Sequence, residues 1–231
     1  MNIHKIKYLA VISMIVDHVT SVFFSADAIS YILIKLVGRV AAPAMCFALA
    51  QGFIHTSDRK KYLLRLIVFA VISQIPYSYY MSGSIWFPTG NMLFTLACSF
   101  LLLEVVKHYK NLGILSIPIA ICILYIATFT DWFVFGPLFT LSFYLNKGNK
   151  DLQALCHACI SFLSLGYSAY VCIQHGLPWY SQVWQIGAIL IIPIIYLYNG
   201  QLGRKTSFNK WFFYLFYPLH LLMIRMIHWG F

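Results

Sequence analysis

Long apolar runs separated by short polar breaks make up most of this 231-residue chain. A helix needs about 20 apolar residues to cross the hydrocarbon layer of a bilayer. The pattern predicts nine such segments, at roughly residues 8–25, 31–54, 61–80, 91–107, 113–130, 133–146, 152–173, 181–198 and 210–229. The sixth is short and contains Gly136 and Pro137, so a re-entrant or tilted segment is an alternative to a full crossing there.

The composition excludes a soluble protein. Hydrophobic residues make up 61% of the chain and charged residues 10%, far from the averages of soluble domains. We therefore expect an all-α, polytopic transmembrane bundle, with residues 1–231 forming a single integral membrane domain and lipid as its surroundings. The net charge of +10 would suit nucleic acid, but no soluble basic domain exists to bind it, so no nucleic-acid partner is expected.

The positions of the basic residues predict an orientation. Lys and Arg concentrate in cytoplasmic loops of membrane proteins, and thirteen of the sixteen here fall in alternate breaks. The intervening loops, around residues 26–30, 81–90, 130–132 and 174–180, contain none. Nine crossings with a cytoplasmic N-terminus and an external C-terminus follow, in a bacterial inner membrane. The three cations outside this scheme are Lys35, Arg39 and Arg225.

The first apolar run imitates a signal peptide, since "MNIHKIK" precedes it and "ADA" at residues 26–28 follows it. Asp17 and His18 interrupt the run, and the topology requires it as a helix, so we expect no cleavage. The six cysteines lie within apolar segments and are expected to be buried thiols. Cys156 and Cys159 flank His157 without further ligands at zinc spacing, so no metal site is expected.

Four ionisable side chains are predicted to share one level of the membrane. Asp17 and His18 in the first segment, Arg39 in the second and His220 in the ninth all fall roughly 10 to 14 Å inside the outer boundary, at 1.5 Å per helical residue. A charged carboxylate at such a depth is costly and usually functional. This level is the first candidate site.

Arg39 is the expected ion-pair partner of Asp17, because the two lie at equal depth on consecutive antiparallel helices. Neighbouring helix residues point about 100° apart, so Asp17 does not orient His18, which faces another part of the bundle, in the direction of His220. A purely structural lock between two helices is the alternative reading of the ion pair.

Polar residues outside this level have simpler interpretations. Asn91 opens the fourth helix, and Gln74 is suited to an interhelical hydrogen bond. Glu104 is expected in a solvated ion pair with Lys107 and His108, and Asp131 lies at the outer surface without a special role. The histidines at positions 157, 175 and 228 are expected to be peripheral.

Lys7 lies eleven positions before His18, which is three helical turns plus about 20°. They should therefore share one helix face, roughly 16 Å apart along the axis. A cation at the cytoplasmic rim would then lie below a histidine deep in the membrane. This spacing of a basic residue, ten others and a histidine resembles the signature of membrane acyltransferases.

Five stretches together resemble the TraX family, named for the F-pilin acetylase of conjugative plasmids. They are "KIKYLAVISMIVDH", "GRVAAPAMCFALAQGF", "GNMLFT", "DWFVFGPL" and "FFYLFYPLHLL", and they occur in order between residues 5 and 222. The Asp-His pair, the Gly-Arg-x-Ala-x-Pro stretch and the Tyr-Pro-x-His motif are specific in combination. Members often have Glu where this chain has Gln51, so no acid acts at that position here.

The resemblance implies acetyl transfer from acetyl-CoA, as co-substrate, to a protein or small-amine acceptor of the pilin N-terminus type. The catalytic residues would be His18, as general base or through an acetyl-imidazole, with Asp17, Arg39 and His220. Two further groups are expected to bind the substrates. CoA phosphates would favour the cytoplasmic Lys5, Lys7, Arg59 and Lys60, and the acceptor would meet Asn91, Gln74 and Tyr217. A multi-pass transporter or proton-coupled channel is the alternative.

Overall fold

The computed structural model describes residues 1–24, 29–204 and 206–229, and within these ranges the regular structure is helical. The α-helices are α1 (Ile3–Phe23), α2 (Ile29–Gly38), α3 (Ala41–His55), α4 (Arg59–Ser82), α5 (Met92–Lys107), α6 (Tyr109–Leu112), α7 (Ser116–Ala127), α8 (Phe135–Leu145), α9 (Lys150–Gln174), α10 (Ile192–Leu197) and α11 (Ser207–Trp229). Two 3-10 segments, η1 (Gly113–Leu115) and η2 (Val183–Ile191), precede α7 and α10. The prediction of an all-α helical membrane bundle is confirmed.

Each of the nine predicted apolar segments has a helical counterpart in the same order. In the described parts of the chain, five helical stretches are long and apolar enough to cross a membrane: Ile3–Phe23, Ile29–His55, Arg59–Ser82, Tyr109–Ala127 and Lys150–Gln174. The segments Phe135–Leu145 and Val183–Leu197 are apolar but shorter. The sixth segment, suspected of not crossing fully, is thus one of the short ones.

Asparagine and aspartate side chains begin four of the helices. Asn2, Asp58, Asn91 and Asn149 each accept a hydrogen bond from a backbone N–H in the first turn of α1, α4, α5 and α9. Such caps satisfy donors that have no partner within the helix. The polar breaks that divide the apolar runs therefore also fix where the helices start.

The second predicted segment is interrupted. Arg39 and Val40 form a turn between α2 and α3, where a continuous helix over residues 31–54 was expected. Pro43 explains the break, because its ring has no N–H to donate to the carbonyl of Arg39 and would clash with that carbonyl in a regular helix. Arg39, one of the candidate site residues, thus lies where the helix is broken.

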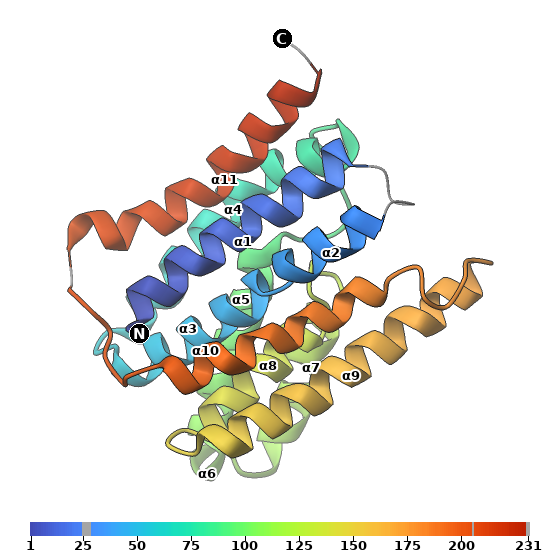
Figure 1. The fold of residues 1–231 in the computed structure, drawn as a ribbon. Coiled ribbons are helices and arrows are strands. Elements are labelled where there is room, and N and C mark those ends of the chain that lie inside the picture. The colour runs from blue at the N-terminus through green and yellow to red at the C-terminus, as the bar shows by residue number, and fades with distance from the viewer. Residues whose placement is uncertain (25–28, 205, 230–231) are drawn as a thin grey trace. The chain divides into compact units, whose positions relative to one another are not determined.

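The chain divides into two compact units, which are described separately. Unit 1 contains residues 1–45 and 146–203. In it α1 packs on α2, α2 packs on η2, and η2 and α10 pack on α9, as Figure 1 shows for the blue and orange helices. The start of α1 is attached to the segment after α10, since the Ile3 amide donates to the Gln201 carbonyl at 3.0 Å.

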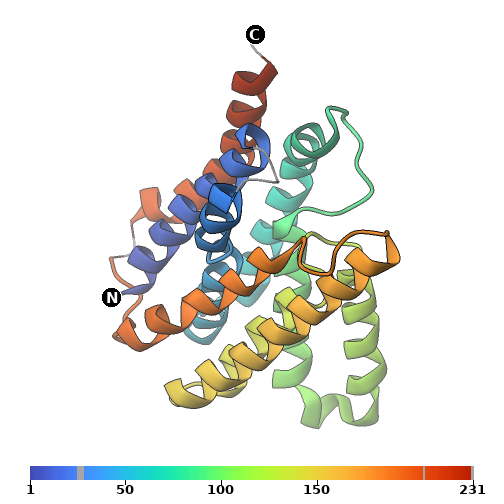
Figure 2. The ribbon, with the colours of Figure 1, turned by 45° about the vertical axis from the view of Figure 1, so that its right-hand side comes forward.

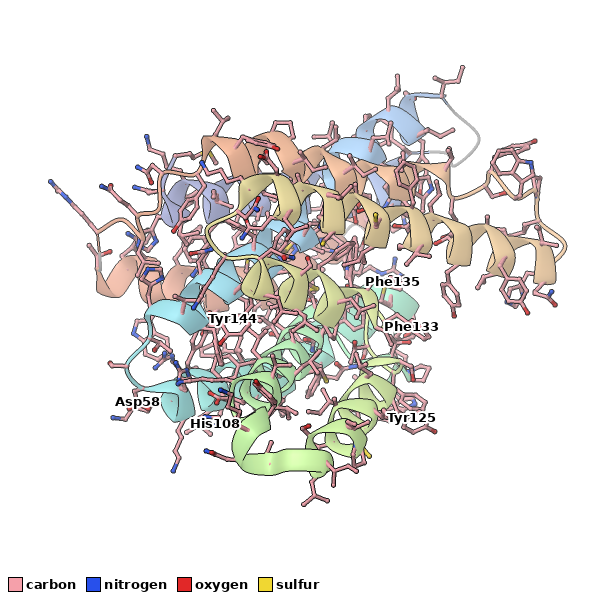
Figure 3. The ribbon with its side chains drawn as sticks, turned by 90° about the horizontal axis from the view of Figure 1, so that it is seen from below. Asp58, His108, Tyr125, Phe133, Phe135 and Tyr144 are labelled. Carbon is pink, nitrogen blue, oxygen red and sulfur yellow. The ribbon has the colours of Figure 1, made fainter. Side chains whose placement is uncertain are left out.

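Unit 2 contains residues 46–145 and 204–231. Its helix α5 packs against α4, α7 and α8, and α4 also packs against α11. The segment between α4 and α5 runs back from the C-terminal end of α4 to the start of α5, as the teal trace in Figure 2 shows. Seen from below, Asp58 and His108 lie toward one end of this unit, and Tyr125, Phe133 and Phe135 toward the other (Figure 3).

Two expectations about individual side chains were wrong. His157 is fully buried, not peripheral, and its Nε2 lies 3.0 Å from the Ala188 carbonyl oxygen, which connects α9 to η2. The cysteines at 46, 98 and 172 are buried as expected, whereas those at 122 and 159 are exposed and Cys156 is half-buried; all six are free thiols. An apolar position in a membrane helix can face lipid, so apolar neighbours do not predict burial inside the protein.

The orientation can be tested with reporters fused after Ser57, Ser84, Asn149 and Gly176, each close to a helix end. Alternation of basic and uncharged loops predicts that the first and third read cytoplasmic and the other two external. Alkaline phosphatase and green fluorescent protein fusions would measure this. Reporters at 57 and 84 on the same side would contradict a membrane-crossing α4.

Candidate functional site

The carboxylate of Asp17 is bound by two cations in unit 1. Lys35 Nζ lies 3.1 Å from Oδ1, and Arg39 Nη2 lies 2.9 Å from Oδ2. All three side chains are largely enclosed, with exposed fractions of 13% for Asp17, 3% for Lys35 and 14% for Arg39. The predicted Asp17–Arg39 ion pair is therefore present, and it is part of a three-residue cluster whose formal charge is +1.

Lys35 was not predicted as a site residue, although its spacing from Arg39 indicated that the two side chains share a helix face. It lies four residues before Arg39, so the two project from the same face of α2 and the turn after it. Lys35 also donates to the hydroxyl of Ser21, one turn along α1 from Asp17. The two cations thus attach α2 to α1 at successive turns.

An indole ring covers both cations. The guanidinium carbon of Arg39 lies 4.4 Å, and Lys35 Nζ lies 5.1 Å, from the ring centroid of Trp184 in η2. A cation over an aromatic face gains on the order of 1 to 2 kcal/mol when it is shielded from water. Trp184 lies 145 residues after Arg39, and nothing in the sequence pattern marked it as part of the site.

Two glycines allow α1, α2 and η2 to approach closely around this cluster. A Cβ on Gly38 would lie 2.7 Å from Asp17 Cβ, and a Cβ on Gly187 would lie 2.2 Å from the Leu36 carbonyl oxygen. The Ser13 hydroxyl donates to the Val37 carbonyl at 3.0 Å, near the end of α2. The geometry of the ion cluster therefore depends on backbone contacts as well as on charge.

Lys7 and His18 lie on the single uninterrupted helix α1, which meets the condition for their expected alignment. Both side chains are half-buried, and His18 interacts electrostatically with Asp17. Lys5, another predicted CoA contact, is exposed near the start of the same helix. The roles of these three residues stay predictions.

His220 belongs to unit 2 and is buried on α11. Its Nδ1 lies 3.0 Å from the Phe216 carbonyl oxygen, and its ring stacks on the Phe216 ring at 4.7 Å with an interplanar angle of 4°. A carbonyl oxygen only accepts, so Nδ1 is the protonated nitrogen in this contact. Its predicted relation to His18 spans the two units and stays a prediction.

The three residues assigned to the acceptor come together in unit 2. The Asn91 side-chain amide donates to Gln74 Oε1 at 2.9 Å and to the Ala70 carbonyl at 2.7 Å. Gln74 donates onward to the Thr89 carbonyl at 3.0 Å. The Tyr217 hydroxyl accepts from the Met92 amide at 3.2 Å. These contacts fix the start of α5 against α4 and α11, which is the interhelical role expected of Gln74; binding of an acceptor stays a prediction.

Two predicted CoA contacts, Arg59 and Lys60, begin α4 in unit 2. Lys60 is exposed. Arg59 Nε lies 3.6 Å from Glu104 Oε1, and its guanidinium covers the Phe53 ring at 4.6 Å. Glu104 Oε2 also lies 3.4 Å from His108 Nε2, as expected, whereas Arg59 and not Lys107 is its second partner among the described residues. Arg59 is therefore partly engaged within the protein, and Lys60 is better placed to meet a phosphate.

The helices and the intramembrane ion cluster define a polytopic all-α membrane protein with a charged site inside its apolar layer. The family described as "TraX protein" matches residues 2–228, and the chain belongs to this family. It is also 30% identical to the probable fimbrial assembly protein FimC, serogroup H1, of Dichelobacter nodosus, over 95% of this chain and 93% of that protein. No solved structure matches.

Removing the carboxylate should destabilise the protein more than removing either cation. Asp17→Asn leaves two enclosed cations facing each other, at a cost of about 3 to 5 kcal/mol for uncompensated buried charge. Arg39→Gln leaves the neutral pair of Asp17 and Lys35, and should cost less. Thermal unfolding in detergent would measure both single variants and the double variant, whose loss should be smaller than the sum. Strictly additive losses would contradict coupling within the cluster.

Adding one methyl group at Gly38 should disturb the same cluster. Its Cβ would lie 2.8 Å from the Asp17 Cα, which cannot rotate away, and overpacking of this kind costs roughly 1 to 3 kcal/mol. Gly166→Ala is the matched control, because a Cβ there meets nothing within 4 Å and alanine favours the helix. Unfolding temperatures should fall for Gly38→Ala and stay level or rise for Gly166→Ala; equal temperatures would show that α1 and α2 adjust freely.

Proposed function

We propose that this protein is an integral membrane acetyltransferase that moves an acetyl group from cytoplasmic acetyl-CoA to an amine acceptor resembling a pilin N-terminus. Membership of the TraX family and the similarity to a probable fimbrial assembly protein support a pilin-related role. The observation that carries the chemical proposal is the arrangement of α1, where one helix bears His18 next to the ion cluster and Lys7 near its N-terminal end. The bacterial inner membrane is the proposed location.

His18 is proposed to act as the base. The acceptor nitrogen attacks the thioester carbonyl, a C–N bond forms, and the C–S bond breaks to release the CoA thiolate. His18 takes the proton that the nitrogen loses and returns it to the thiolate, so the imidazole ends neutral. An acetyl-imidazole formed on His18 is the alternative route, with the same overall balance.

The ion cluster would support this chemistry in two ways. It fixes α1 against α2 at the residue before His18, which limits the positions that the imidazole can adopt. Its formal charge of +1 also favours negative charge nearby, and the acyl oxygen becomes negative as the amine adds. Asp17, Lys35 and Arg39 are therefore proposed as positioning residues for His18.

The phosphates of acetyl-CoA would bind the basic residues at the N-terminal ends of α1 and α4. Lys5 and Lys60 are exposed, and exposed ammonium groups attract phosphates without the cost of burial. Lys7 lies about 16 Å of helix away from His18, a separation that the extended pantetheine arm would bridge. The contacts of Lys5 and Lys7 with CoA are proposed for unit 1, and that of Lys60 for unit 2.

His18→Ala should abolish acetyl transfer while folding and CoA binding persist, because a base acts only in the transition state. Lys7→Ala should weaken acetyl-CoA binding with a smaller effect on single-turnover transfer, and added salt should reproduce part of that defect. Labelled acetyl-CoA binding and single-turnover transfer in nanodiscs would measure both. His175→Ala, at an exposed helix end, is the control. Full transfer activity in His18→Ala would refute the mechanism.

One observation keeps a transporter as the second candidate. The helix is broken between α2 and α3 at Arg39. Interrupted helices and buried charges are features of the substrate-binding sites of transporters. Transporters commonly also have internal repeats, and none is visible in this sequence. Flux of a solute into liposomes, without bound CoA in the purified protein, would favour this candidate over the enzyme.

A further inference from the structure

The helix α5 begins beside the middle of α4, far from the end of α4. Asn91, which caps α5, donates to the Ala70 carbonyl at 2.7 Å. Ala70 is twelve residues before Ser82, the last residue of α4, so about 18 Å of helix extends beyond this contact. Met92 likewise donates to Tyr217, near the middle of α11. The polar segments at the start of α5 are therefore set back from the ends of α4 and α11.

The loop between α7 and α8 is attached at this recessed level. The Gly90 amide donates to the Phe129 carbonyl, and the Asp131 amide donates to the Gly90 carbonyl, both at 2.8 Å. Thr95 and Thr130 bond through their hydroxyls at 2.9 Å. A Cβ on Gly136 would lie 2.3 Å from the Thr95 methyl group. This loop is thus fixed by the backbone and side chains of α5 and the segment before it.

Asp131 is the acid that this loop presents. Its side chain is exposed, and Oδ1 accepts a hydrogen bond from the buried Tyr77 hydroxyl at 3.2 Å. Tyr77 is five residues before the end of α4, so the contact lies about 8 Å of helix below that end. Tyr217 also interacts electrostatically with Asp131. The carboxylate is therefore exposed and held beside the buried Tyr77 hydroxyl.

The backbone beside Asp131 is held in a strained conformation. Phe133 has φ of +48°, and among the described residues it is the non-glycine residue with positive φ. Such a conformation costs of order 1 to 3 kcal/mol and persists where the surroundings impose it. The hydrogen bonds of Gly90 and Thr95 to this loop thus hold its backbone in place where it exposes a charge, which favours binding over a merely solvated turn.

We propose that Asp131, with Tyr77 beside it, is the docking site for the ammonium group of the acceptor. Carboxylates and aromatic rings are the groups that recognise a primary ammonium. Lys and Arg are missing from the predicted external loops, so no basic side chain of these loops would repel an incoming ammonium group. That the acceptor is an amine rests on the proposed function. The inference assigns the specificity for amines to Asp131. Deprotonation and acetyl transfer follow after docking.

The test measures binding of two peptides to the full chain in nanodiscs by saturation-transfer NMR. Tetra-alanine amide has a free α-ammonium group, and its N-acetylated form is neutral. The wild type should bind the free amine about tenfold more tightly than the acetylated form, as a charge-assisted hydrogen bond predicts. Asp131→Asn should remove that preference while keeping an acceptor for the Tyr77 hydroxyl.

Asp151→Asn is the matched control. Asp151 is also exposed and accepts a tyrosine hydroxyl, from Tyr196 at 2.6 Å, but it lies at the first turn of α9 on the predicted cytoplasmic side. This variant should keep the wild-type preference. Tyr77→Phe keeps the carboxylate charge and should reduce the preference only in part.

Each outcome separates this inference from the proposed function. Equal binding of the two peptides to the wild type, or an unchanged preference in Asp131→Asn, would overturn the docking site whether or not acetyl transfer occurs. A lost preference in Asp131→Asn would support it even if no transfer is detected, since the peptides bind without acetyl-CoA. Where transfer is detected, Asp131→Asn should raise the KM for the peptide about tenfold with little change in kcat, as expected for loss of uniform binding.

Discussion

The carboxylate of Asp17, enclosed within an apolar bundle, imposes the main constraint on unit 1. An isolated charge of this kind would be too costly to keep, so the carboxylate needs a cation at hydrogen-bonding distance. Lys35 and Arg39 do so at 3.1 and 2.9 Å. Two cations on one carboxylate leave a surplus positive charge, and the Trp184 ring lies against both of them. The cluster therefore requires α1, α2 and η2 to meet at one level.

This requirement accounts for the unusual backbone nearby. The helices approach so closely that Gly38 and Gly187 have no room for a Cβ. The helix stops after Gly38 and restarts at Ala41 because Pro43 cannot continue it, which places Arg39 in the turn. A continuous helix would direct Arg39 by its helical register alone. Arg39 keeps that register, since its amide still donates to the Lys35 carbonyl at 3.0 Å, and its side chain lies between Asp17 and Trp184.

The parts of this arrangement that depend on local spacing could be predicted from the sequence. The lengths of the apolar runs located the nine segments, and counting depth along antiparallel neighbours paired Asp17 with Arg39. The break at Pro43 and the shared face of Lys35 and Arg39 were also visible in the sequence, but a long apolar run favoured one helix. Trp184 could not be found in this way, because its contact joins segments 145 residues apart and depends on how η2 packs.

The polar residues of the family motifs have two roles, structural and chemical, which the sequence alone does not separate. Asn91, Gln74 and Thr95 direct hydrogen bonds to the protein's own backbone and side chains, and thereby fix the start of α5 and the loop before α8. Asp131 belongs to the same junction, yet its side chain is exposed and carries a charge. These contacts serve the architecture, whichever reaction the protein performs. The chemical roles are therefore better assigned to the charged side chains that the architecture presents than to the motif as a whole.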